Sequence, residues 1–160
     1  TQIALMDGDE LVLGVSSAPI YGETMWARVG DGAWLDGERV QVADTGTIAE
    51  ASLSTGNIRT LTTDSRWDAF GALIRDSNRI RGYGDFCHYH LLARGSLDLV
   101  IESDVNILDV AALAVIVREA GGVFTDLDGH ALTLDTRSVL AGSTAIHAQA
   151  LSRLRSPTIT

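Results

Sequence analysis

Residues 106–129 read NILDVAALAVIVREAGGVFTDLDG, and this stretch decides the fold class that we expect. Its apolar residues recur at helical spacing as far as residue 120. Asn106 has the side chain of an N-cap residue, and Gly121-Gly122 is a helix stop signal. We therefore expect a helix over 106–120, followed by a short strand over 123–125.

On either side of this stretch, helical and strand-like segments alternate from about residue 50 onward. We expect helices over 64–76, 85–94 and 145–155, and strands over 50–54, 97–101 and 138–142. Helices that alternate with strands in this way predict an α/β layer.

The first 41 residues contain short apolar runs separated by Asp-Gly turns, which is the pattern of an antiparallel β-meander. The expected strands cover 3–6, 11–15, 24–29 and 33–35. The chain opens inside an apolar run, so we expect it to be part of a longer protein. On this interpretation residues 1–45 are the tail of one domain, a partial antiparallel sheet, and residues 46–160 form an α/β domain.

Composition excludes several classes of protein. Of the 160 residues, 46% are hydrophobic and 21% charged, which excludes an intrinsically disordered chain. The net charge is −9 and every basic residue is Arg, so nucleic acid is not an expected partner. The sequence has no run of 18 apolar residues, and we expect no membrane partner. The single cysteine, Cys87, excludes a disulfide framework and is expected to be a small buried side chain.

Three acids, Glu102, Asp104 and Asp109, fall within eight residues, directly after an expected buried strand. Carboxylates at a strand end and a helix start can converge on Mg²⁺, which prefers oxygen ligands. In the alternative interpretation, Asp109 lies in the first helical turn only to complement the helix dipole. A catalytic metal would need further ligands from elsewhere.

The segment RGYGD, residues 81–85, precedes an expected helix. Its glycines allow close backbone approach, and Arg81 can pair with a phosphate or a carboxylate. The alternative is an ordinary loop in which Asp85 caps the helix. His88 and His90 are two residues apart and so lie on different helix faces, which favours structural roles over a shared metal.

The combination of these motifs resembles a known family. Residues 106–129 resemble the C-terminal signature of the inositol monophosphatase superfamily, Trp-Asp-Xaa-Ala-Ala followed by Glu-Ala-Gly-Gly. Residues 3–37 resemble the segment after that family's metal-binding core. Residues 82–85 and 106–109 look most like the histidinol-phosphate phosphatase branch. Inositol-type members carry a small hydroxyl residue or Ala where Asp85 stands. Leu108 occupies the place of the signature Trp, and we interpret it as a variant packing position.

The resemblance implies a sugar-phosphatase fold, inositol monophosphatase-like, and Mg²⁺-dependent hydrolysis of a small phosphomonoester with no covalent enzyme intermediate. Asp109 matches a metal ligand, and Glu102 matches the acid that contacts substrate hydroxyls. Arg81, Gly84 and Asp85 match the substrate-recognition segment. Asp85 and Glu102 are the specificity candidates, because histidinol phosphate carries an amine and an imidazole.

The family's other metal ligands lie in a Glu-Glu pair and an Asp-Pro-Xaa-Asp-Gly-Thr motif, and neither occurs in this sequence. We therefore expect a fold truncated at its N-terminus and little or no phosphatase activity from the chain alone. The favoured parent function is cytoplasmic histidinol-phosphate hydrolysis in histidine biosynthesis. The alternatives are an inositol-1-phosphate or related sugar or nucleotide phosphatase, and a non-catalytic remnant that binds a ligand. The unpaired sheet edge predicts a homo-oligomer, most simply a dimer.

Overall fold

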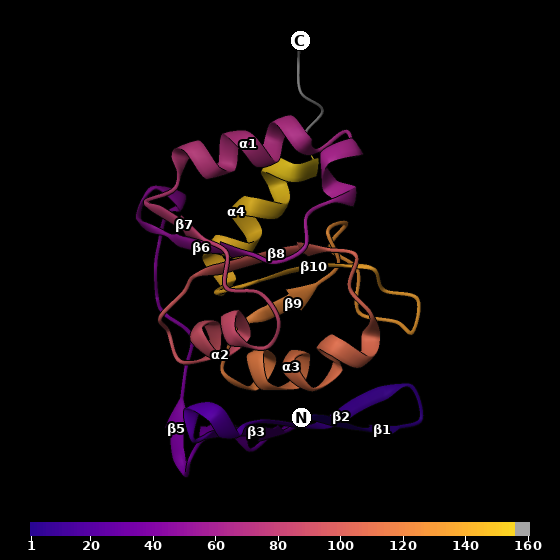
Figure 1. Ribbon diagram of the computed structural model, residues 1–160. Helices are drawn as coiled ribbons and strands as arrows, with labels where there is room; N and C mark the ends of the chain where they lie inside the picture. The colour runs from indigo at the N-terminus through magenta and orange to yellow at the C-terminus, as the bar shows by residue number, and fades with distance from the viewer. Residues whose placement is uncertain (156–160) are drawn as a thin grey trace.

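The computed structural model describes residues 1–155 and has four layers (Figure 1). A helix pair, α1 and α4, covers one face of a mixed sheet, and a second pair, α2 and α3, covers its other face. An antiparallel sheet lies against the far side of α3. The α/β class expected from the sequence is confirmed.

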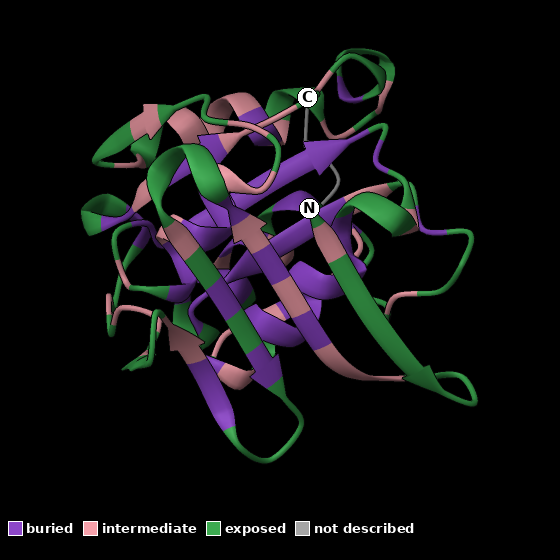
Figure 2. Cartoon of the chain, turned by 60° about the horizontal axis from the view of Figure 1, so that its bottom comes forward, coloured by how far each residue is buried: buried purple, intermediate pink, exposed green. Residues whose placement is uncertain are grey.

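The antiparallel sheet is a meander in which the strands neighbour one another in chain order. Its strands are β1 Gln2–Asp7, β2 Glu10–Ala18, β3 Glu23–Arg28, β4 Gly32–Leu35 and β5 Glu38–Val40. Side chains alternate between its faces, as the striped burial in Figure 2 shows. Met25 and Ala27 face the core, whereas Trp26 stacks on Trp34 on the outer face. The four expected strands are confirmed, and β5 is an additional one.

The mixed sheet has the strand order β7-β6-β8-β10-β9. Its strands are β6 Ser52–Thr55, β7 Arg79–Arg81, β8 Leu99–Ser103, β9 Val123–Thr125 and β10 Ser138–Gly142. Strand β6 runs parallel to β7 and β8, so these strands end at the same edge of the sheet. Strand β7 was not expected, because two of its three residues are arginines, a composition that suits only an edge strand.

The helices are α1 Trp67–Asp76, α2 Cys87–Ala93, α3 Ile107–Glu119 and α4 Thr144–Arg155. Asn106 caps α3 as expected, because its Oδ1 accepts a hydrogen bond from the Leu108 amide at 2.9 Å. Every residue from 110 to 117 is buried, whereas apolar residues at helical spacing predict burial along one side of a helix only. A sheet lies on each side of α3, and a helix in that position needs apolar residues all round.

The meander and α3 approach each other closely at Gly14 of β2. A Cβ atom at Gly14 would lie 2.2 Å from the backbone oxygen of Ala112, so only glycine fits there. Met25 and Ala33 of the meander share one apolar core with Leu113 of α3. The parts of the chain before and after residue 45 are therefore packed together. Within residues 1–155, no helix combines the length and apolar character needed to cross a membrane.

Candidate active site

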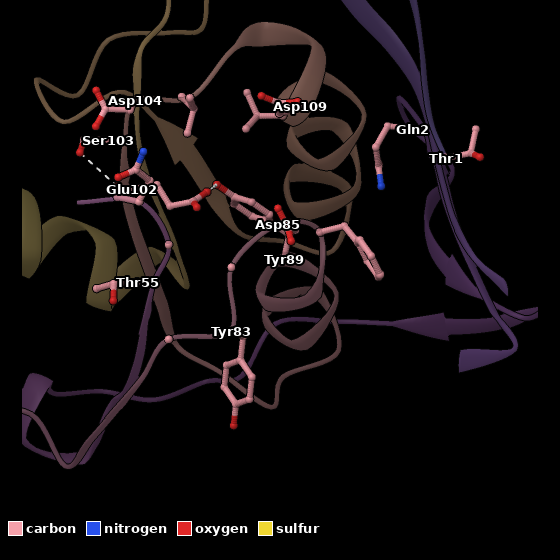
Figure 3. A pocket seen from close by; sticks show the side chains of 17 residues that line it. Thr1, Gln2, Thr55, Tyr83, Asp85, Tyr89, Glu102, Ser103, Asp104 and Asp109 are labelled. Carbon is pink, nitrogen blue, oxygen red and sulfur yellow. Dashed lines mark hydrogen bonds between the residues drawn. The ribbon is translucent and has the colours of Figure 1, made fainter. Parts of the chain in front are cut away.

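A cavity of about 620 Å³ opens where the parallel strands β6 and β8 end and where α2 and α3 begin. Open α/β sheets bind ligands at this edge. Four acids line the cavity: Asp85 before α2, Glu102 and Asp104 at the end of β8, and Asp109 in the first turn of α3 (Figure 3). Among the described residues, no Arg, Lys or His side chain lines the cavity, so its wall carries negative charge.

Glu102 is nearly buried, with 7% of its surface exposed. Its Oε2 accepts a hydrogen bond from Tyr89 Oη at 2.5 Å. The pKa of Tyr89 is raised well above its usual value. Burial is the largest cause, followed by the charge and the hydrogen bond of Glu102 and by the charge of Asp109. Tyr89 therefore remains a proton donor and fixes one oxygen of the Glu102 carboxylate.

Gly56, directly after β6, lies against the other oxygen of Glu102. A Cβ atom at this position would lie 1.6 Å from Oε1, so glycine is required for Glu102 to occupy its place in the wall. Sequence reasoning missed both Tyr89 and Gly56. The signal that could have found Gly56 is a glycine directly after a strand, which often marks a close approach by another group.

The turn before α2 has an unusual backbone. Gly84 has a φ of 68° and Asp85 a φ of 48°, so two consecutive residues are left-handed. The expectation that Asp85 caps the helix is wrong: the residue at the N-cap is Phe86, with no side-chain cap. Left-handed non-glycine residues cluster at functional sites. Here the turn presents Asp85 to the cavity.

Asp109 is exposed and lies in the first turn of α3, where the helix dipole favours a negative charge. Within the described chain, its carboxylate has no side-chain hydrogen bond or ion pair, so Asp109 is suited to be a ligand of a hard cation.

The neighbouring Leu108 is 80% exposed. Its interpretation as a packing position is therefore wrong, because it lies on the solvent side of the first turn.

The expected convergence of Glu102, Asp104 and Asp109 on one cation is not found in residues 1–155. These acids do not form a group of three with ligand atoms within 4.8 Å of one another. Glu102 turns toward Tyr89, and Asp104 Oδ2 accepts a hydrogen bond from the Thr60 amide at 3.1 Å. The two acids are thus directed to different partners. Of the three, only Asp109 has a carboxylate with no hydrogen bond to another part of residues 1–155.

In the described chain, three such side chains do lie together in the turn after β9: Asp126, Asp128 and His130, with ligand atoms within 4.8 Å of one another. The acids among them already have partners. Asp126 Oδ1 accepts hydrogen bonds from two backbone amides of the turn, and Arg66 donates to Asp128 Oδ1 at 3.0 Å. These contacts account for the cluster as a structural turn.

Arg81 is the one predicted site residue that the structure does not bring into the cavity. It lies at the end of the edge strand β7, is exposed, and donates to the backbone oxygen of Ile80 at 2.7 Å. An edge strand directs such a side chain to solvent, which separates Arg81 from the acids.

His88 and His90 lie on different sides of α2, as expected. His90 Nε2 is 2.6 Å from Ser16 Oγ, and its Nδ1 is 3.4 Å from Glu23 Oε2. Burial lowers the pKa of His90, more than the nearby Glu23 raises it. These contacts join α2 to the meander, a structural role. Cys87 was expected to be a small buried side chain, and the structure buries it only in part.

Comparison with known proteins gives independent evidence on the family to which this chain is related. A family model described as the inositol monophosphatase family matches residues 1–158. A histidinol-phosphatase of Streptomyces coelicolor is 39% identical over 138 residues, 81% of this chain and 52% of that protein. A histidinol-phosphatase of Mycobacterium tuberculosis is 37% identical over 157 residues, 95% of this chain and 60% of that protein.

A solved structure of an inositol monophosphatase from Zymomonas mobilis has the same fold, with a TM-score of 0.89 at 26% identity. The similarity covers 97% of this chain and 62% of that one. The chain thus spans about half to three fifths of the length of the curated relatives that it matches.

Proposed function

We propose a reaction for this cavity on the premise that the chain belongs to the inositol monophosphatase family. The proposed reaction is the metal-dependent hydrolysis of a phosphomonoester whose alcohol part is cationic. Histidinol phosphate is the specific substrate that we propose. It carries an amine and an imidazole beside its phosphate. A cytoplasmic place in histidine biosynthesis is part of the same proposal and rests on the resemblance.

The observation that carries this proposal is the charge of the cavity. Asp85, Glu102, Asp104 and Asp109 supply four carboxylates, and no basic side chain within the described chain neutralises them at the wall. Closely spaced carboxylates repel one another and attract cations, so binding a divalent metal and an ammonium group would relieve this repulsion. A neutral polyol would relieve none of it.

Each acid has a role that follows from its surroundings. Asp109, exposed and unpaired, would be a ligand of Mg²⁺, which when bound would polarise the phosphate and activate water. Glu102, fixed at one oxygen by Tyr89, would accept a hydrogen bond from the alcohol part of the substrate. Asp85, held in a strained turn, would face the cationic end.

The chain on its own is proposed to release little or no phosphate. Residues 1–155 bring no group of three metal ligands together at the cavity, and one carboxylate does not fix a catalytic metal. The division at residue 45 into a partial metal-domain sheet and an α/β domain belongs to this proposal. The alternative is that the chain binds a small molecule without turnover. It applies if no metal ligands are supplied from outside these residues.

An inositol-1-phosphate or related activity is the second candidate. It is favoured by relatives such as the fructose-1,6-bisphosphatase/inositol-1-monophosphatase of Thermotoga maritima, which is 30% identical over 146 residues. The residue that separates the two candidates is Asp85, since its charge suits a cationic alcohol.

The test is calorimetric binding of histidinol phosphate and of inositol-1-phosphate to the chain, each with and without Mg²⁺, together with phosphate release. We expect Mg²⁺-dependent binding of histidinol phosphate and at least tenfold weaker binding to Asp85→Asn and Glu102→Gln, as loss of a charged hydrogen bond implies. Ser17→Ala, on the meander, is the control. Equal binding of both phosphates by the unaltered chain would contradict the assigned substrate.

A further inference from the structure

Two consecutive residues of α2, His88 and Tyr89, approach the same oxygen of Glu102. Tyr89 Oη lies 2.5 Å and His88 Nε2 lies 3.1 Å from Oε2. The two rings meet edge to face with their centroids 4.3 Å apart, and His88 has 0% exposed surface. A fully buried imidazole thus stands behind a cavity carboxylate, and the proposed function does not yet use it.

His88 Nε2 has no hydrogen-bond partner within residues 1–155, although Oε2 is close. The ring N–H is therefore directed to one side of the carboxylate oxygen. A buried donor without an acceptor destabilises the folded state, and such groups are rare in folded proteins. The unpaired nitrogen points to a hydrogen bond that forms when the Glu102 side chain turns.

The other ring nitrogen indicates where the proton lies. His88 Nδ1 is 3.2 Å from Ser54 Oγ, which accepts a hydrogen bond from the Tyr83 amide at 3.3 Å. Ser54 can then donate its own hydroxyl proton to Nδ1. A bare Nε2 would place its lone pair against a carboxylate, which is repulsive. Nε2 therefore carries the proton and can donate to Glu102.

The other oxygen of Glu102 is the one left for a ligand. Oε1 lies against the backbone of Gly56, a cavity residue without a side chain. A ligand donor that binds Oε1 would draw the carboxylate away from its resting position, with Tyr89 still attached to Oε2. A small turn about the last bond of Glu102 is enough to change the direction of Oε2.

We propose that His88 is a positioning residue: when an ammonium or hydroxyl group of a ligand binds Oε1 of Glu102, Oε2 turns onto Nε2–H of His88. Glu102 is then held by two protein donors and directed at the ligand. This inference rests on the proposed role of Glu102 in substrate binding. On this proposal, His88 strengthens the binding only of ligands that bring a hydrogen-bond donor to the cavity. A ligand without a donor does not turn the carboxylate.

The test compares two variants that each keep half of the imidazole. His88→Gln can still donate toward Glu102, whereas His88→Asn keeps only the polar group that faces Ser54. We expect His88→Asn to weaken calorimetric binding of histidinol phosphate with Mg²⁺ about tenfold, and His88→Gln to stay within about threefold of the unaltered chain. Phenyl phosphate, which has no donor on its alcohol part, should bind both variants equally.

Thermal melts of both variants separate this role from a general loss of packing. An equal loss of binding for both variants, or for both phosphates, would overturn the proposal. A second measurement needs no ligand: nitrogen-15 NMR of the His88 ring should show a proton on Nε2, and a proton on Nδ1 alone would also overturn it. Failure of the unaltered chain to bind histidinol phosphate would instead count against the proposed function, while a proton on Nδ1 alone would still overturn this inference.

Discussion

Replacing Gly56 with Ala tests the cavity wall most directly. The added Cβ would lie 1.6 Å from Oε1, 2.5 Å from Cδ and 2.9 Å from Cγ of Glu102. To restore an ordinary contact of 3.4 Å, Oε1 must move by about 1.8 Å. A shift of that size removes Oε2 from Tyr89 Oη, which now lies 2.5 Å away.

The expected cost follows from the bond that is lost. Tyr89 is fully buried, so its hydroxyl would be left without its charged acceptor. Losing a hydrogen bond to a charged group costs about 2 kcal/mol, which for a domain of this size lowers Tm by roughly 4–8 °C. Urea denaturation and a thermal melt would measure both quantities.

The matched control is Gly82→Ala, a glycine of the same cavity. A Cβ there would lie 3.4 Å from the nearest atom, the backbone oxygen of Thr55, so we expect a change below about 0.5 kcal/mol. In a Glu102→Ala background the clash is gone, and Gly56→Ala should cost almost nothing. If Gly56→Ala cost the same with and without Glu102, the steric reasoning would be refuted.

Three further predictions concern the buried histidines, the sheet edge and the metal ligand. Burial lowers the pKa of His90 and His147, so the folded chain binds fewer protons than the unfolded chain just below pH 6.5. The free energy of unfolding should therefore fall by roughly 1 kcal/mol between pH 7.5 and pH 5.5, measured with urea, and a chain with Gln at both positions should lose that slope. If the slope survived both substitutions, the pH dependence would arise from other groups. Ile3 and Leu5, each 56% exposed on the edge strand β1, favour self-association. Size-exclusion chromatography should show a dimer or larger species that Leu5→Glu shifts toward monomer, whereas a monomer of the unaltered chain would contradict the proposal. Asp109→Asn should weaken Mg²⁺ binding at least tenfold by calorimetry while Tm without Mg²⁺ changes by less than about 2 °C. Unchanged Mg²⁺ affinity would remove Asp109 from the site.

Local signals predicted most of the fold. The stretch from Asn106 to Gly122 was predictable because capping and apolar spacing act within a few residues. The left-handed backbone at Asp85 was not, because an aspartate before a helix normally indicates an N-cap. Strand β7 forms only because β6 offers it a partner, and its two arginines hide that tendency.

The candidate site divides in the same way. Asp85, Glu102 and Asp109 could be named because acids near helix starts and strand ends are visible in the sequence. Tyr89 and His88 were not named for it, because their contacts with Glu102 depend on how α2 packs against the end of β8. Gly56 left a local signal, a glycine directly after a strand, but not the identity of the group that approaches it. Arg81 was expected at the cavity because it adjoins Gly84 and Asp85 in sequence, yet an edge strand directs it to solvent.

The position of α3 between two sheets has a consequence for synthesis on the ribosome. The strands of the meander, with Met25, Ala27 and Ala33 on their inner face, are complete by residue 40, but the helix that covers most of this face is formed by residues 107–119. At about 5–20 residues per second, roughly eighty further residues take about 4–16 s to emerge. During that interval a finished apolar surface has no helix to cover it. The nascent chain should therefore be most vulnerable to misassociation, and most dependent on chaperones, before α3 leaves the exit tunnel.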